Sequence, residues 1–360
     1  MVNWIKDLFS SNKENNNKIG NVLSLFDGMS CGQIALDKLG VKYGNFYASE
    51  IDKHAMKVTQ HNFPNTIQIG DVTKLNGADL PKIHLLMGGS PCTNFSFSGK
   101  RSGMITKDKV EITSLDQYLV YKEQGYEFDG QSYLFWEFIR MLKEVKPTYF
   151  LLENVVMGEK WKKILTEAVS RQVSENNNSD LILIEPIEIN SSLVSAQNRV
   201  RLYWTNIPNI QQPEDRGVGL TDILEDDDKI NPGAIRGRKL NKATILGRRL
   251  NEEGKREDYN MSIPITQCLE VRATNTNKSN CLTTVAKDNV LTTMPIGRHP
   301  DAFNKKLPFR YYTSKEYCRL QTVPDDYFDG VASENQIRKM IGNGWTVDVI
   351  AHIFKNMESL

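Results

Sequence analysis

Short apolar runs alternate with amphipathic segments from residue 21 to residue 155, and this alternation strongly constrains how the chain can fold. The apolar runs predict strands at residues 21–26, 43–52, 66–72, 83–89 and 148–155, with further candidates at 181–190 and 201–207. The intervening segments predict helices at residues 32–40, 54–63 and 132–147. Strands that alternate with helices indicate an α/β fold with a doubly wound sheet. Such sheets bind ligands at the carboxyl ends of their strands.

Changes in composition and periodicity along the sequence divide the chain further. With 360 residues it is long enough for one large domain or for two. A polar, glycine-rich segment without clear periodicity predicts a smaller, irregular domain at residues 206–280, after a first domain at residues 21–205. Residues 281–360 carry two more helical stretches and are expected to return to the first domain. Residues 1–20 are expected to form a short N-terminal helix and a polar linker.

Chemically distinctive residues fall at the ends of the predicted strands. Gly28 and Gly32 in the turn FDGMSCG allow a close approach of backbone to a ligand, although a turn without a ligand has the same pattern. Glu50 follows the second strand and can accept hydrogen bonds from ribose hydroxyls, and Asp71 follows the third and can accept one from an adenine amine. Each acid alone is more typical of a solvated or helix-capping residue. Together they indicate an adenosine-type ligand held without a phosphate clamp, because the chain has no Walker-type lysine.

A second group of residues suggests covalent chemistry. Cys92 follows Pro91 in the loop GGSPCTNFSFSG, where it is either a buried filler or a displayed nucleophile. Glu153 ends the run LLENV, where a buried acid without a function would be costly. Arg199 and Arg201 alternate along a predicted strand and therefore point to one face of it.

These blocks resemble, in their order, the signature blocks of the cytosine-C5 DNA methyltransferases. They read SLFDGMSCG, YASEID, IGDVTKL, GGSPCTNFS, LLENV, QNRVRLYW, CLTTV and MIGNGWTV, and they span about residues 21 to 355. The resemblance implies a Rossmann-like methyltransferase sheet, a target-recognition domain at residues 206–280, duplex DNA as substrate and S-adenosylmethionine as cofactor. It implies cofactor contacts from Phe26, Asp27, Gly28, Ser30, Gly32, Glu50, Ile51, Asp71, Val72, Ser90, Pro91 and Asn343.

The resemblance also implies a mechanism. The thiolate of Cys92 adds to C6 of cytosine, C5 of the resulting enamine attacks the methyl group, a base removes the C5 proton, and Cys92 leaves. Glu153 contacts N3 and the exocyclic amine, while Arg201, with Arg199 nearby, stabilises the charge that builds on the ring. Because C5 and C6 are inaccessible in a stacked duplex, the base is expected to flip out.

DNA contacts are expected mainly from one basic stretch. The formal net charge of the chain is only +1, so a nucleic-acid surface must be a local patch. Residues 236–256 hold eight basic residues against two acidic ones, within the expected target-recognition domain. A solvated basic loop has the same composition. The DNA-binding candidates are Gln197, Arg236, Arg238, Lys239, Arg248 and Arg249.

The remaining features of the composition indicate the cellular compartment and the partners to expect. Five scattered cysteines form no C-x-x-C pair, so no metal site is expected, and their odd number suits a reducing cytoplasm, or a nucleus if the source is eukaryotic. The sequence has no apolar run near 18 residues and no hydrophobic leader core, so no membrane association is expected. A monomer is expected. The resemblance leaves a restriction endonuclease partner, phage-genome protection and a solitary role all open.

Several alternatives stay open on sequence alone. Residues 100–130 are long for the loop that follows the nucleophile and fit either extra DNA contacts or a solvated insertion. A transfer RNA methyltransferase on the same framework remains an alternative to a DNA enzyme. A catalytically inactive homologue is disfavoured by the retained Cys92, Glu153 and arginines. A NAD-dependent dehydrogenase is disfavoured because the first turn lacks the full G-x-G-x-x-G pattern.

Overall fold

The computed structural model describes residues 18–91, 95, 103–225, 240–272 and 277–358. Within them a seven-stranded sheet has the order β3-β2-β1-β4-β7-β9-β8. Its strands are β1 (Asn21–Leu25), β2 (Phe46–Ser49), β3 (Ile67–Gln68), β4 (Ile83–Gly89), β7 (Tyr149–Val155), β8 (Ile187–Asn190) and β9 (Val200–Thr205). Neighbouring strands from β3 to β7 are parallel, whereas β9 runs antiparallel to both β7 and β8.

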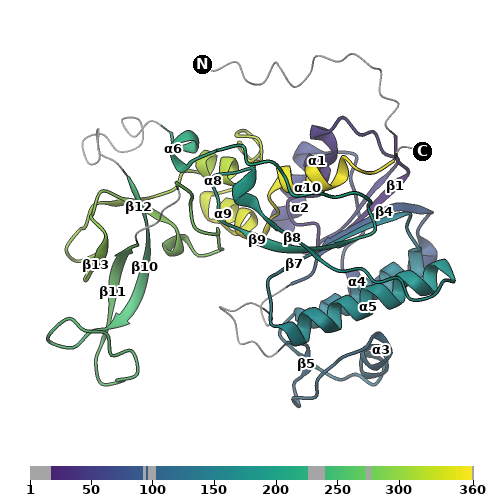
Figure 1. Cartoon of the computed structure of the whole chain (residues 1–360), viewed down its shortest axis with the longest axis horizontal. Coiled ribbons are helices and arrows are strands. Elements are labelled where there is room, and N and C mark those ends of the chain that lie inside the picture. The colour runs from purple at the N-terminus through teal and green to yellow at the C-terminus, as the bar shows by residue number, and fades with distance from the viewer. Residues whose placement is uncertain (1–17, 92–94, 96–102, 226–239, 273–276, 359–360) are drawn as a thin grey trace.

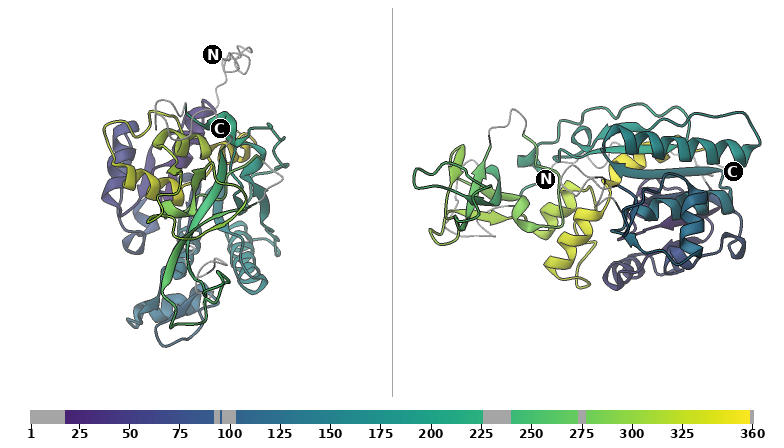
Figure 2. Two further views of the ribbon diagram at one scale, coloured as in Figure 1. Left: turned by 90° about the vertical axis from the view of Figure 1, so that its left-hand side faces the viewer. Right: turned by 90° about the horizontal axis from the view of Figure 1, so that it is seen from below.

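Helices cover both faces of this sheet, as Figures 1 and 2 show. Along β4, Leu85 and Met87 belong to one apolar core and Leu86 to the other, which is the period of two expected of a doubly covered strand. One layer contains α1 (Cys31–Lys38), α2 (Lys53–Asn62) and α10 (Val347–Phe354), and the other contains α4 (Phe135–Val145) and α5 (Glu159–Asn177). The doubly wound fold predicted from the sequence is therefore present.

One predicted strand is wrong in its first half. Residues 181–186 are not part of the sheet, and β8 begins only at Ile187. The backbone N–H groups of Ile182 and Ile184 donate instead to the hydroxyls of Ser174 and Ser170, at 2.7 and 2.9 Å. These serines of α5 satisfy amides that a strand would have used in its ladder.

The segment that follows the Pro-Cys loop is folded where it is described. Residues 103–131 contain α3 (Leu115–Glu123) and the paired strands β5 (Ile105–Thr106) and β6 (Phe128–Asp129). Met104 and Tyr118 are almost completely buried in the core beneath α4 and α5. Gly103 has a φ of +68°, and a Cβ atom there would lie 1.8 Å from the Trp161 ring. Residues 103–131 therefore contribute to the folded core and do not form a fully solvated insertion.

A second, antiparallel sheet of five strands has the order β13-β11-β10-β12-β14. Its strands are β10 (Asn241–Arg249), β11 (Ile265–Val271), β12 (Val290–Thr292), β13 (Gly297–His299) and β14 (Phe309–Tyr311). The small domain expected to be irregular thus contains a regular sheet, which extends past the boundary expected at residue 280. Ile207 and Leu220, within the segment assigned to the small domain, pack instead in the core of the large sheet.

Short helices join the two sheets. They are α6 (Leu220–Ile223), α8 (Ser314–Leu320) and α9 (Glu334–Asn343). In Figure 1, α8 and α9 lie between the large sheet and the small one, which projects from the end of the molecule. No helix of the described residues combines the length and apolarity needed to cross a bilayer. The sequence predicts the N-terminal helix and linker at residues 1–20, and residues 1–17 of that segment lie outside the described residues.

Candidate active site

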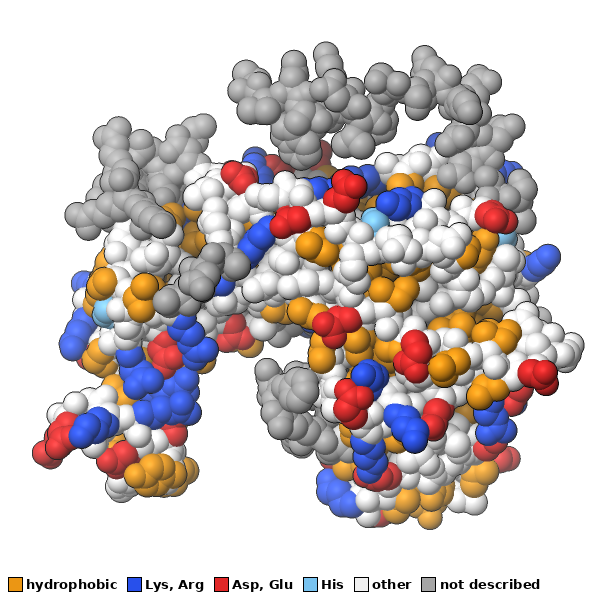
Figure 3. Space-filling model, viewed as in Figure 1, with side chains coloured by type: hydrophobic (Ala, Val, Ile, Leu, Met, Phe, Trp, Pro, Cys, Tyr) orange, Lys and Arg blue, Asp and Glu red, His pale blue; other side chains and the backbone are white. Residues whose placement is uncertain are grey.

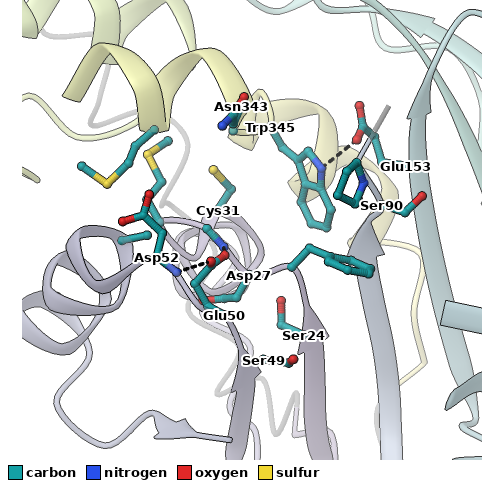
Figure 4. A pocket seen from close by; sticks show the side chains of 18 of the residues that line it. Ser24, Asp27, Cys31, Ser49, Glu50, Asp52, Ser90, Glu153, Asn343 and Trp345 are labelled. Atoms are coloured by element: carbon teal, nitrogen blue, oxygen red, sulfur yellow. Dashed lines mark hydrogen bonds between the residues drawn. The ribbon is translucent and has the colours of Figure 1, made fainter. Parts of the chain in front are cut away.

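A cavity of about 450 Å³ opens at the carboxyl ends of β1, β2, β4 and β7. Its walls come from the first βα turn, from the segments after β2, β3 and β4, and from the loop that joins α9 to α10 (Figure 4). Its volume suits a ligand of small-molecule size. Of the predicted cofactor residues, all but Ser30 and Gly32 line the cavity.

The first βα turn is shaped by unusual backbone conformations. Phe26, Gly28 and Ser30 have φ values of 55°, 59° and 62°, in the left-handed region. Gly32 is needed for packing, because a Cβ atom there would lie 2.3 Å from the sulfur of Met87 on β4. The structure therefore gives Gly32 a role in bringing α1 close to the sheet, rather than a place in the cavity wall.

Asp27 is a buried carboxylate with one oxygen that lacks a hydrogen-bond donor among the described residues. Its Oδ1 accepts a hydrogen bond from the Ser30 hydroxyl at 3.2 Å, while the buried Oδ2 has no hydrogen-bond partner among the described residues. Burial raises the pKa of Asp27 to about 7, against the lowering effect of hydrogen bonds from Ser24 and Ser30. A buried oxygen without a donor is costly, so this site favours a ligand that brings a donor or a positive charge.

Glu50 links the first turn to the start of α2. Its Oε2 accepts from the backbone N–H of Gly28 at 2.8 Å, and its Oε1 accepts from the N–H groups of Ile51 and Asp52 at 2.7 and 2.8 Å. These bonds account for three of the roughly four acceptor positions of a carboxylate, which leaves one for a ligand hydroxyl.

The far end of the cavity combines a free acceptor with apolar surface. Asp71 Oδ1 accepts from the N–H and hydroxyl of Thr73, both at 2.9 Å, while Oδ2 has no hydrogen-bond partner among the described residues. The side chain of Ile51 is 67% exposed although it lines the cavity, whereas Val72 is buried. A flat ring with an amine at its edge would cover Ile51 and donate to Asp71.

A positioning group behind this wall was not anticipated from the sequence. The guanidinium of Arg140, on α4, donates to the carbonyls of Val72 and Leu75 at 2.8 and 2.9 Å. Arg140 is held in turn by Glu137, which is fully buried. Arg140 thus fixes the segment that carries Asp71. The sequence pattern of its amphipathic helix does not indicate this contact.

The other half of the cavity presents an acid and an arginine. Glu153 ends β7, and its Oε1 lies 3.0 Å from Nε of Arg201 on the adjacent β9. Its Oε2 accepts from the indole N–H of Trp345 at 3.0 Å (Figure 4). Asn154 donates to the carbonyl and hydroxyl of Ser90, so the end of β7 also fixes the loop that leads to Pro91. Trp345 lies in the block MIGNGWTV, but the sequence did not identify it as a partner of Glu153.

Arg199 has a different environment from Arg201. Arg199 is 4% exposed, and its guanidinium donates to the carbonyls of Leu282, Gly342 and Gly344, at 3.1, 3.3 and 2.8 Å. Although Arg199 lines the cavity, its donors hold the backbone of its wall. The structure therefore supports a positioning role for Arg199, and its contact with the reacting base stays a prediction.

The prediction that Gln197 contacts DNA is wrong. Its side chain is fully buried and donates to the carbonyl of Leu320 and to Gln321 at 2.9 and 3.0 Å. Its Oε1 accepts from the N–H of Leu282 at 2.8 Å. The polar atoms of its side chain thus tie the segment before β9 to the segments around residues 282 and 320. A glutamine in a polar block gives no indication of burial before the fold is known.

The other DNA candidates divide between described and undescribed parts of the chain. Arg248 and Arg249 lie on β10 of the small sheet, away from the cavity. Cys92, Arg236, Arg238 and Lys239 lie outside the described residues. Pro91, the residue before Cys92, lines the cavity together with Glu153 and Arg201.

Comparisons with known proteins agree with this architecture. A family model described as C-5 cytosine-specific DNA methylase matches residues 20–115 and 120–359. Similar solved structures include a DNMT2 mutant from Spodoptera frugiperda, at 18% identity, a TM-score of 0.59 and coverage of 94% of this chain and 99% of that one. The methyltransferase EhMeth of Entamoeba histolytica has 14% identity and a TM-score of 0.59, over 93% and 97% of the two chains. These likenesses confirm the Rossmann-like methyltransferase fold.

Curated relatives match part of the chain. Orphan methyltransferase M.SPBetaI of Bacillus phage SPbeta is 32% identical over 204 residues, which are 52% of this chain and 44% of that protein. Orphan methyltransferase M.Rho11sI of Bacillus phage rho11s is 38% identical over 136 residues, 37% of this chain and 22% of that protein. The matched part of the chain therefore spans less than half the length of these relatives.

Proposed function

This chain belongs to the C-5 cytosine-specific DNA methylase family, and we propose that it transfers a methyl group from S-adenosylmethionine to C5 of cytosine in duplex DNA. The observation that carries the proposal is a single cavity with two chemically different halves. Asp27, Glu50 and Asp71 offer acceptors for an adenosine-type cofactor at one end, and Glu153 and Arg201 form an ion pair at the other.

The residues of the cavity fit S-adenosylmethionine. The unpartnered buried oxygen of Asp27 suits the positive charge of the methionine part, and the remaining acceptor position of Glu50 suits a ribose hydroxyl. Asp71 and the exposed side chain of Ile51 suit the amine and the ring of adenine. When bound, the cofactor supplies an electrophilic methyl group.

Replacing Asp71 with asparagine should weaken S-adenosylmethionine binding about 10- to 150-fold. Asparagine keeps an oxygen that can accept from Thr73, but its amide NH₂ replaces the free acceptor with a donor. The expected loss of about 1.5–3 kcal/mol is that of a hydrogen bond to a charged group. Calorimetry with the purified protein measures the change, and Asp116→Asn, in the first turn of α3, is the matched control. Equal affinities of Asp71→Asn and wild type would contradict the placement of adenine.

S-adenosylmethionine affinity should fall about tenfold for each pH unit below about 7. Because burial raises the pKa of Asp27 to about 7, the free protein carries a proton there at lower pH. A positively charged ligand binds the ionised form, so the proton must leave first; above pH 7 this cost disappears and the affinity becomes constant. Calorimetry from pH 5.5 to 8 measures the slope. Asp27→Asn should bind more weakly and lose the slope, and a persistent slope in that variant would refute the assignment.

The second half of the cavity suits the activation of cytosine. Cytosine C5 becomes nucleophilic only after a thiolate adds to C6, and the proposed thiolate is that of Cys92. Glu153 would hold N3 and the exocyclic amine, and Arg201 would hold O2 as negative charge develops. Cys31 also lines the cavity, but burial raises the pKa of its thiol to about 12, so it remains protonated and unreactive.

The small sheet is the proposed target-recognition region. The family description names DNA, and the sheet carries arginines on the face opposite its own small apolar core. Flipping a base out of the duplex costs a few kcal/mol, which contacts between this region and DNA would offset.

The direct test uses methyl-labelled S-adenosylmethionine with a mixed-sequence duplex and, in parallel, with transfer RNA. The proposal predicts label in duplex DNA as 5-methylcytosine within a fixed sequence context, read by bisulfite sequencing. Label in transfer RNA alone would replace the proposal with an RNA methyltransferase. Cofactor binding without transfer to either would favour an inactive homologue.

A further inference from the structure

Three arginines of the small sheet surround one carboxylate, Glu270 on β11. The Nε atoms of Arg248, on β10, and Arg298, on β13, donate to the same oxygen, Oε1, at 2.9 and 3.1 Å. Arg272, two residues beyond Glu270, donates to Oε2 at 3.3 Å. Glu270 and Arg298 are direct partners in the β11–β13 register, so the strand pairing itself brings this pair together.

This group lies on one face of the small sheet. Ala243, Ile245, Leu269 and Val271 point to the opposite face, where they form a small apolar core. Because side chains alternate along a strand, Arg248 and Glu270 project away from that core. Figure 3 shows basic side chains gathered over β10 and β11, beside the hollow that separates the small sheet from the rest of the molecule.

The group carries a local excess of positive charge. Arg248 and Arg256 also contact Asp258, at 3.6 Å for Arg248. Four arginines (248, 256, 272 and 298) against two acids (258 and 270) give 4 − 2 = +2, in a chain whose formal net charge is +1. Burial would raise the pKa of Glu270, but the hydrogen bonds from the arginines outweigh it and lower that pKa, so the carboxylate stays charged at neutral pH.

The three arginines differ in which of their guanidinium nitrogens are available to a ligand. Arg248 is 15% exposed, and its Nη1 lies 3.6 Å from Asp258 while its Nε donates to Glu270, so this side chain is held between two carboxylates. Arg298 is 34% exposed, and among the described residues its only hydrogen bond is made by Nε, so both terminal nitrogens remain available. Arg272 is 74% exposed and makes one long contact. A guanidinium fixed through Nε presents its terminal fork in one orientation, whereas a loosely held one acts as a mobile charge.

We propose that Arg298 reads a guanine edge in the target site, that Glu270 positions it, and that Arg272 contacts a phosphate of the same duplex. This inference rests on the proposed DNA substrate and adds which residues select the sequence. A terminal fork matches O6 and N7 of guanine in the major groove, and holding it in advance lowers the entropy lost on binding. The target site therefore contains an invariant G·C pair in addition to the modified cytosine.

The test compares Arg298→Ala, Arg298→Lys, Arg272→Ala and Glu270→Gln with wild type. Arg171→Ala is the matched control, since it removes an arginine that is 68% exposed on α5 and pairs with Glu175. Each protein methylates a randomised duplex library, and bisulfite sequencing gives the base preference at every position. Duplex binding at several salt concentrations gives the slope of affinity against salt, and a melting temperature establishes that each variant is folded.

Both Arg298 variants should lose about 10- to 100-fold in preference for guanine at one position, because lysine cannot form the paired bonds. Glu270→Gln should relax the same position without lowering the salt slope, since it removes a negative charge. Arg272→Ala should keep the context and lower the salt slope by about one unit. Arg171→Ala should match wild type in both.

The outcomes separate this inference from the proposed function. If wild type methylates DNA but the folded Arg298 variants keep its context unchanged, the inference fails and the DNA substrate stands. A wild-type context with no invariant G·C pair besides that of the modified cytosine overturns it equally. If wild type methylates no DNA at all, the proposed function fails, and the inference fails with it.

Discussion

Replacing Cys92 with alanine should reduce methyl transfer by about 10⁴-fold or more while S-adenosylmethionine binding is retained. The thiolate is the only group in the proposed mechanism that makes C5 nucleophilic, so its loss removes a covalent step and cannot be compensated by positioning. The proposed cofactor half of the cavity contains Asp27, Glu50 and Asp71, none of which the substitution changes. Single-turnover transfer of labelled methyl groups and calorimetry measure the two quantities.

Cys268→Ala provides the matched control for that variant. Cys268 is a buried thiol of β11 in the small sheet, remote from the cavity lining. Its replacement should leave the rate within about tenfold of wild type, since the change removes one small buried side chain. Transfer at the wild-type rate by Cys92→Ala would refute the assignment of the nucleophile.

Replacing Glu153 with glutamine should lower the rate of methyl transfer by about 10²- to 10⁴-fold, the range of a lost general acid–base group. Glutamine has nearly the same shape and can still accept from the indole of Trp345. It cannot neutralise Arg201, whose Nε lies 3.0 Å from the carboxylate, and it cannot exchange a proton with N3 of cytosine. Single-turnover rates at saturating cofactor and DNA isolate the chemical step.

Trp345→Phe separates the charge of Glu153 from its position. This variant removes the indole N–H that donates to Oε2 and keeps the ion pair with Arg201. The rate should fall by about tenfold or less, because one neutral hydrogen bond contributes about 1 kcal/mol. Equal losses in Glu153→Gln and Trp345→Phe would indicate that Glu153 acts only as a structural residue.

The sequence predicted the large sheet well because its signal is local. The run at residues 83–89 is apolar except for His84 and is observed as β4 with the same bounds, since a strand covered on both faces needs no polar side. The apolar residues 181–184 do not enter the sheet, because the serines of α5 accept hydrogen bonds from the backbone N–H groups of Ile182 and Ile184. A strand ladder and a side-chain acceptor compete for the same backbone N–H groups. The outcome depends on tertiary contacts, which the periodicity of the sequence does not indicate.

The cavity was predictable where a role follows from position in a strand–turn–helix unit. Asp27, Glu50 and Asp71 follow three parallel strands, so their convergence follows from the fold. Gln197 and Arg199 belong to the same block as Arg201 but turn inward to hold backbone and side-chain groups. Glu270 and Arg298 lie outside the basic stretch at residues 236–256 and meet only through the β11–β13 register, so composition along the chain could not reveal them.

The most direct measurement of the central claim uses a duplex that carries 5-fluorocytosine at the methylated position. Fluorine cannot leave C5 as a cation, so release of the enzyme is blocked after methyl transfer and the protein stays attached to DNA. The account predicts a conjugate that survives denaturation, requires S-adenosylmethionine, maps to Cys92 by mass spectrometry and is absent from Cys92→Ala. A wild-type protein that methylates the unmodified duplex but forms no conjugate, or a conjugate that maps to another residue, would contradict it.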